Sequence, residues 1–241
     1  MCKYVESTNI GDAYLQALRL LINRCRQYLI VHISNPAQDH LLMECPSSSD
    51  IDDWLEIINV GDFYEKFSNL KLYKRCRYGK SGKDWINDRT YALLHRKGAY
   101  FRRIEKQLKM VEKRLQVRDK KGRRMHGSCT NALVCQVFDS HDLENACKPR
   151  PNAKNLPCLT MIDFKPKGDR LNLLAVFRSQ YIDTKAYGNF ISLAILLYKM
   201  CSKTKYKPGA LISMANNVTF HDRRHRKLLK NLLEEDLEFI P

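Results

Sequence analysis

The chain has 241 residues, a length typical of one large domain with a substantial core. Hydrophobic residues make up 44% and charged residues 28%, and Gly and Pro are scarce, which excludes disordered and collagen-like proteins. The formal net charge of +16 predicts an anionic partner: a nucleotide, a polyanionic cofactor tail or a nucleic acid.

The amino end and the cysteines bear on location. Residues 1–14 lack the apolar core of a secretory signal, and no stretch approaches the roughly 18 uninterrupted apolar residues of a membrane span. The nine cysteines are spread singly, with no C-x-x-C pair, which argues against a disulfide framework or zinc ribbon. We therefore expect a cytoplasmic protein without a membrane partner, in which most cysteines are small core residues.

The first half of the chain predicts helices around one strand. Apolar residues recur at helical spacing over 10–22, with Asn9 as a possible cap, and the alternating residues 28–33 predict a strand. Residues 47–53 predict a loop that leads into a helix over 54–67. Over 98–118 apolar residues again recur every three or four positions, with Lys and Arg on the other faces, which predicts a basic amphipathic helix.

The second half predicts strands around one apolar helix. Residues 119–127 predict an exposed turn, 132–138 a strand that ends at Asp139, and the proline-rich 147–157 a loop. A hairpin is expected from strands 159–164 and 171–177 joined by a turn at 166–169. The sequence after Arg178 predicts a polar loop and then a buried helix over 190–200. It also predicts a strand over 211–214 and a basic helix over 223–237. The pattern favours an α+β fold in a single domain.

The segment from Leu156 to His221 resembles the thymidylate synthase superfamily. The matching segments are LPCLTMIDF, FRS, GNFISLAILLY, and KPG followed by a strand. They follow the order of the family's Pro-Cys nucleophile, Arg-Ser phosphate motif, Asn-bearing helix start and terminal strand, over about a quarter of the chain. The resemblance implies a mixed β-sheet flanked by helices.

The resemblance assigns roles to four residues. Cys158 is the nucleophile that adds to a pyrimidine ring, and Arg178 is the positive neighbour that favours its thiolate. Arg178 and Ser179 would bind the substrate phosphate, since a guanidinium fork and a hydroxyl suit a phosphate monoester. Asn189, eleven residues after Arg178, would bind the pyrimidine edge and favours uracil. Composition alone also allows a buried Cys158, a surface Arg178 and a helix-capping Asn189.

Other candidates are weaker. Tyr78, in Tyr78-Gly79-Lys80, resembles the family's Tyr-Gly segment, and His221 lies where the family binds the ribose, so both are substrate-binding candidates. The candidates for the catalytic acid are Asp52, Asp53 and Glu56, which can equally be solvated acids at a helix start. His221 and His225 are four residues apart but lack a third ligand, so no metal site is predicted.

Several positions depart from the family pattern. Its arginine pair before the nucleophile strand is replaced by Thr130 and Asn131, with Arg123 and Arg124 nearby. Leu159 replaces a histidine, Tyr181 an aspartate, and Thr219 and His221 the ribose-binding His and Tyr. These departures favour an alternative function: an altered family member that binds nucleotides or nucleic acid through the basic residues of 102–118 and 223–230.

The reaction implied by the resemblance transfers one carbon from 5,10-methylenetetrahydrofolate to C5 of a pyrimidine nucleotide. The product carries a methyl or a hydroxymethyl group, and the sequence does not choose between them. The family also implies a homodimer with its sheets packed back to back, because the active site of such enzymes is completed across the dimer.

Overall fold

A mixed sheet of seven strands organises the computed structural model, which describes residues 2–22, 27–36, 100–117, 132–149, 156–204 and 206–220, with 226, 227 and 230. The strands are β1 (Cys2–Ser7), β2 (Gln27–Ile33), β3 (Val134–Gln136), β4 (Leu159–Lys167), β5 (Arg170–Phe177), β6 (Gln180–Tyr181) and β7 (Lys207–Thr219). Their order is β1-β2-β7-β5-β4-β3, and β6 also pairs with β7. The mixed α/β structure agrees with the predicted α+β class.

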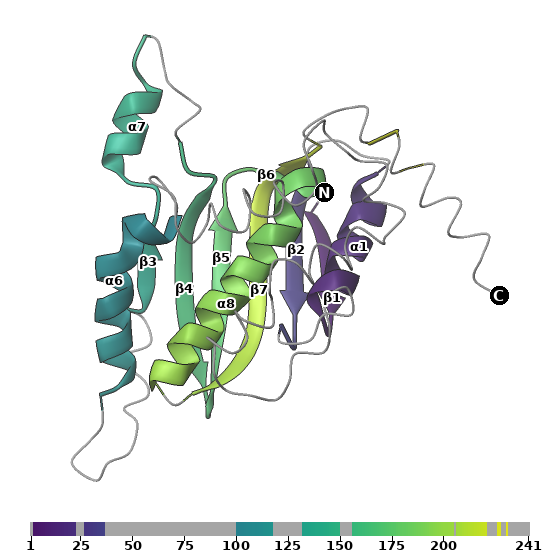
Figure 1. The fold of residues 1–241 in the computed structure, drawn as a ribbon. Helices are drawn as coiled ribbons and strands as arrows, with labels where there is room; N and C mark the ends of the chain where they lie inside the picture. Colours follow the sequence, from purple (N-terminus) through teal and green to yellow (C-terminus); the bar gives the residue numbers. More distant parts are fainter. Residues whose placement is uncertain are drawn as a thin grey trace, which may run out of the picture.

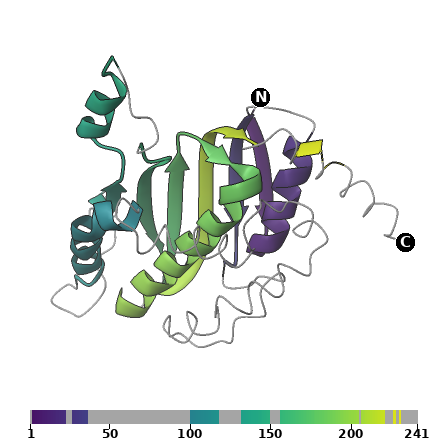
Figure 2. The same ribbon diagram turned by 45° about the horizontal axis from the view of Figure 1, so that its top comes forward.

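The helices are α1 (Ile10–Leu21), α6 (Tyr100–Leu115), α7 (Ser140–Ala146) and α8 (Tyr187–Thr204), with a π-helical turn η3 (Ile182–Ala186) before α8. These bounds confirm the helices predicted over 10–22, 98–118 and 190–200, and Asn9 caps α1 by accepting from the Asp12 N–H. Figures 1 and 2 show α1, α6 and α8 on one face of the sheet.

The core lies between the helices and the face of the sheet that they cover. Side chains alternate along a strand, so every second residue points into this core. Leu29, Val31 and Ile33 of β2 are buried, and the same holds for alternate residues of β5 and β7. On the helices, the predicted stripe of α6 is buried at Ile104, Val111 and Leu115. The hydrophobic effect of burying these side chains is the main contribution to the stability of the fold.

The opposite face of the sheet is only partly buried. Its side chains belong to β1, β2, β4, β5 and β7: Tyr4, Tyr28, Ile30, His32, Met161, Leu174, Val176, Ile212 and Met214. None of the described helices covers this surface, which we call the open face (Figures 1 and 2).

Two glycines are required by local geometry. Gly168, in the turn between β4 and β5, has a φ of 61°, a conformation that glycine adopts without strain. At Gly209 in β7, a Cβ atom would lie 2.1 Å from Asn172 Oδ1, the atom that accepts a hydrogen bond from the Ala210 N–H at 2.8 Å. The glycine therefore lets β7 approach β5 closely.

Several predicted boundaries were wrong. The strand predicted over 132–138 shortens to β3, and Asp139 does not end a strand but caps the unpredicted helix α7 through a capping box. The polar loop predicted after Arg178 forms β6 and η3, the predicted 211–214 strand extends to all of β7, and the 166–169 turn narrows to two residues. The predictions for 47–53, 54–67 and 119–127, and for nearly all of 223–237, lie outside the described residues.

Within the described part of the chain, no helix is both long enough and apolar enough to span a membrane.

Candidate functional site

The residues that carry the sequence resemblance gather at one end of the sheet. Figure 1 places the start of β4, the end of β5, β6 and the first turn of α8 at this end. Cys158 immediately precedes β4, and Arg178 and Ser179 immediately follow β5. The antiparallel β4–β5 hairpin thus returns the chain from the cysteine to the arginine.

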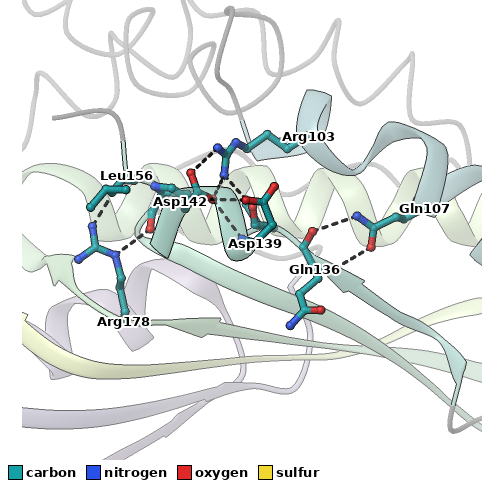
Figure 3. A network of polar contacts seen from close by, with 9 residues as sticks. Arg103, Gln107, Gln136, Asp139, Asp142, Leu156 and Arg178 are labelled. Carbon is teal, nitrogen blue, oxygen red and sulfur yellow. Dashed lines mark hydrogen bonds and ion pairs between the residues drawn. The ribbon is translucent and has the colours of Figure 1, made fainter. Parts of the chain in front are cut away.

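Arg178 is bound to the backbone around Cys158. Its N–H donates to the Cys158 carbonyl at 2.9 Å. Its side chain donates from Nε to the Pro157 carbonyl at 2.9 Å and from Nη2 to the Leu156 carbonyl at 3.4 Å (Figure 3). These bonds fix the loop that carries the thiol, and among the described residues none pairs with Nη1 of this exposed arginine.

Tyr100, the first residue of α6, and Cys158 are both partly buried and pack against the core. Burial raises the pKa of Tyr100, and a charge on Cys158 raises it further, so the phenol keeps its proton at neutral pH. Sequence reasoning missed this residue, because an aromatic side chain at the start of a helix has no distinguishing pattern.

The described cysteines differ in their surroundings. Burial raises the pKa of Cys135 and of Cys201 to about 12, so these thiols are core residues that stay protonated. Cys158 is partly buried at the edge of the core, while Cys2 and Cys147 are exposed. Cys158 therefore combines access with nearby polar groups, as a reactive thiol requires.

The other residues that the sequence predicts for the site are less directly connected to Cys158 and Arg178. Ser179 follows Arg178 and is half-buried, and Asn189 is 6% exposed in the first turn of α8. No contact within the described residues joins the Asn189 side chain to Cys158 or Arg178. Tyr78 and His221 lie outside the described residues, as do the candidate acids and the residues compared with the family's arginine pair: Asp52, Asp53, Glu56, Arg123, Arg124, Thr130 and Asn131.

The positions that depart from the family pattern have structural roles. Leu159, which the sequence comparison set against a histidine of the family, is fully buried and pairs with Phe177 across the hairpin. Tyr181 pairs with Thr219 between β6 and β7, and Lys185 Nζ lies 5.7 Å from the centre of its ring.

The predicted basic surface of α6 is exposed. Lys106, Lys109, Lys113 and Arg114 all face solvent, and Lys109 also forms an ion pair with Glu105 at 2.9 Å. Exposed pairs of this kind contribute little to stability, so these charges remain available to an anionic partner.

A thiol, a neutral phenol and a guanidinium thus meet at one end of the sheet. Chemically, these groups can supply a nucleophile, a hydrogen-bond donor beside it and a ligand for an anion. No protein-family model matches the chain, and no curated protein matches its sequence. The functional argument therefore depends on this geometry and on the residues of the resemblance.

Proposed function

We propose that this protein is a thymidylate synthase-like transferase that modifies C5 of a pyrimidine nucleotide, with uracil the favoured base. The observation that carries the proposal is the set of hydrogen bonds that join Arg178 to Cys158 and Pro157 at the end of the β4–β5 hairpin. The sequence resemblance pairs the same cysteine and arginine, and the fold of the hairpin supports that pairing.

In the proposed reaction the Cys158 thiolate forms a bond to C6 of the pyrimidine. The electrons of the C5–C6 double bond move toward O4, so that C5 becomes nucleophilic. After C5 has accepted the one-carbon unit and lost its proton, the bond between sulfur and C6 breaks and releases Cys158. Methylenetetrahydrofolate would supply the carbon unit and, for a methyl product, the hydride that reduces it, whereas water would complete a hydroxymethyl product. We assign no described residue to the folate.

The neighbouring residues act on binding and orientation. Arg178 holds the thiol loop through Nε and Nη2, and its remaining donors suit a substrate phosphate. Tyr100 remains protonated, because burial raises its pKa. Asn189 would contact the uracil edge, where an amide can both donate and accept.

The open face of the sheet supports the proposed homodimer. Its centre is apolar, with Ile30, Val176 and Met214 in register across β2, β5 and β7. Asp163, opposite Leu174 in β4, has one carboxylate oxygen buried and without a hydrogen-bond partner in the described structure. A second copy packed on this face would bury the apolar residues and can supply a donor to Asp163.

Release of tritium from C5-tritiated dUMP in the presence of methylenetetrahydrofolate tests the proposal. Release that is lost in Cys158→Ala and retained in Cys147→Ala, a change at an exposed cysteine, is the expected result. Failure of dUMP, UMP and dCMP to release tritium, from a folded protein, would contradict it. Binding of nucleic acid that weakens steeply with salt would then favour the alternative, a binding protein with the basic face of α6 as its surface.

A further inference from the structure

Strand β4 contains one extra residue shortly after Cys158. Leu159 lies opposite Phe177 of β5, but Met161 lies opposite Val176, so Thr160 has no partner residue in β5. An extra residue of this kind forms a β-bulge, which bends its strand and redirects neighbouring side chains, and bulges are common beside active sites. The bulge at Thr160 therefore bears on how Cys158 is held.

The bulge decides which residue lies opposite Arg178. Continued by one residue past Leu159, the register places Cys158 opposite Arg178. The 2.9 Å hydrogen bond from the Arg178 N–H to the Cys158 carbonyl agrees with this position. The register that β4 keeps from Met161 onward would instead place Leu159 opposite Arg178. Because a shift of one residue turns side chains to the other face of a sheet, Leu159 would then leave the core in which it is fully buried.

Thr160 is held by hydrogen bonds on two sides. Its hydroxyl donates to the Val176 carbonyl at 2.8 Å, which ties the bulge to β5. Its carbonyl accepts from the N–H groups of Val137 and Phe138, at 2.8 and 3.1 Å, which tie it to the chain that follows β3. The extra residue is therefore fixed in place by both neighbouring segments.

The chain that follows β3 is itself anchored to helix α6. Arg103 Nη1 donates to the Val137 carbonyl at 2.8 Å. The same guanidinium forms a two-pronged ion pair with Asp142 of α7, at 2.5 and 2.6 Å (Figure 3). The Asp142 side chain is 4% exposed, and its carboxylate also accepts from the Asp139 N–H. Two-pronged pairs fix orientation as well as distance, so Val137 is a firm support for Thr160.

We propose that Thr160 is a positioning residue, and that the bulge it forms holds Cys158 opposite Arg178. The inference rests on the proposed role of Cys158 as a nucleophile and adds the residue that sets its position against the arginine. The Thr160 hydroxyl can be removed with little change in the shape of the side chain, so its bond to the Val176 carbonyl is the contact that mutation tests most cleanly.

The first measurement is the hydrogen-exchange rate of the Arg178 amide by NMR, without ligand, because this N–H donates to the Cys158 carbonyl. It requires neither nucleotide nor folate, so its outcome is independent of tritium release. The variants are Thr160→Val, which loses the hydroxyl, and Thr160→Ser, which keeps it. The matched control is Thr204→Val, because the buried Thr204 hydroxyl also donates to a backbone carbonyl, that of Met200 at 2.5 Å, in the last turn of α8.

We expect Thr160→Val to speed exchange of the Arg178 amide about fivefold, the effect of losing one hydrogen bond of ordinary strength. Thr160→Ser stays close to the wild-type rate, and Thr204→Val leaves it unchanged. Should Thr160→Val fail to fold, Thr160→Ala takes its place in the comparison with Thr160→Ser.

The second measurement is the kinetics of tritium release from dUMP. We expect Thr160→Val to lower kcat about tenfold with little change in KM, because a displaced thiol slows the attack on the ring without removing a phosphate ligand. Thr160→Ser restores kcat, which a general loss of stability would not explain.

Four results would overturn the inference: an unchanged Arg178 exchange rate in Thr160→Val, the same acceleration in Thr204→Val, a Thr160→Ser protein that behaves like Thr160→Val, or an unchanged kcat in Thr160→Val when the wild type is active. An exchange rate that follows the Thr160 hydroxyl in a protein that releases no tritium would leave the inference standing and remove the proposed function.

Discussion

Gln180 lies next to Ser179, and both polar atoms of its amide are buried without a hydrogen-bond partner in the described structure. A buried amide without partners destabilises a fold by about 1–3 kcal/mol. Such groups persist in proteins where they serve a purpose beyond folding.

We therefore predict that Gln180→Met raises the thermal unfolding midpoint of the protein without ligand. The matched control is Gln116→Met, because Gln116 is exposed and already donates to the Lys203 carbonyl at 2.9 Å. This control should lower the midpoint slightly or leave it unchanged. A fall in the Gln180→Met midpoint would mean that the assembled protein supplies the amide with a partner.

At the site, the sequence predicted some residues and missed others. Cys158 and Arg178 are twenty residues apart in the sequence and lie next to each other because of the hairpin register. Their pairing was predicted from the family resemblance and not from composition. Tyr100 was missed because its place beside the core depends on how α6 packs on the sheet. Tertiary packing of this kind leaves no periodic signal in the sequence.

Among the elements, α6 and α7 are joined by the Arg103–Asp142 pair, which gives stability a dependence on pH. The hydrogen bonds from Arg103 lower the pKa of Asp142 below its ordinary value in the folded protein. This contribution is therefore fully present above the unfolded pKa, about 3.9, and is lost as pH falls through the lower folded pKa.

We predict that Asp142→Asn lowers the free energy of unfolding at pH 7 by about 2 kcal/mol, as expected for hydrogen bonds to a charged group. The difference from the wild type should persist to pH 5 and shrink below pH 4. Urea unfolding at a series of pH values measures it. A difference that is unchanged at pH 3 would show that the charge of Asp142 does not matter.

Elements with a strong periodicity of apolar residues were predicted well, and short polar elements were not. The stripes of α1 and α6 and the apolar run of α8 gave clear signals. Strand β1 was missed because only Val5 of its six residues is buried, and α7 because its seven residues are mostly polar. The start of β7 was not predicted because Pro208 and Gly209 are unusual within strands. Tertiary packing accommodates both residues there.

For the whole molecule, the open face predicts association of two copies. Met214 lies between Ile30 and Val176 at the centre of this face, so a lysine there would place a charge in the interface. We predict that Met214→Lys converts a dimer to a monomer in light scattering. Met110→Lys, at a methionine 70% exposed on α6, should leave the dimer intact. A monomeric wild type would contradict the proposed arrangement.

The central claim is that Cys158 attacks a pyrimidine ring, and a trapped adduct tests it most directly. The protein is incubated with 5-fluoro-dUMP and methylenetetrahydrofolate, because fluorine at C5 blocks the loss of a proton that would release the enzyme. We predict an increase in intact mass by one nucleotide and one folate, absent in Cys158→Ala. A folded protein that forms no adduct with fluorinated dUMP, UMP or dCMP would contradict the account.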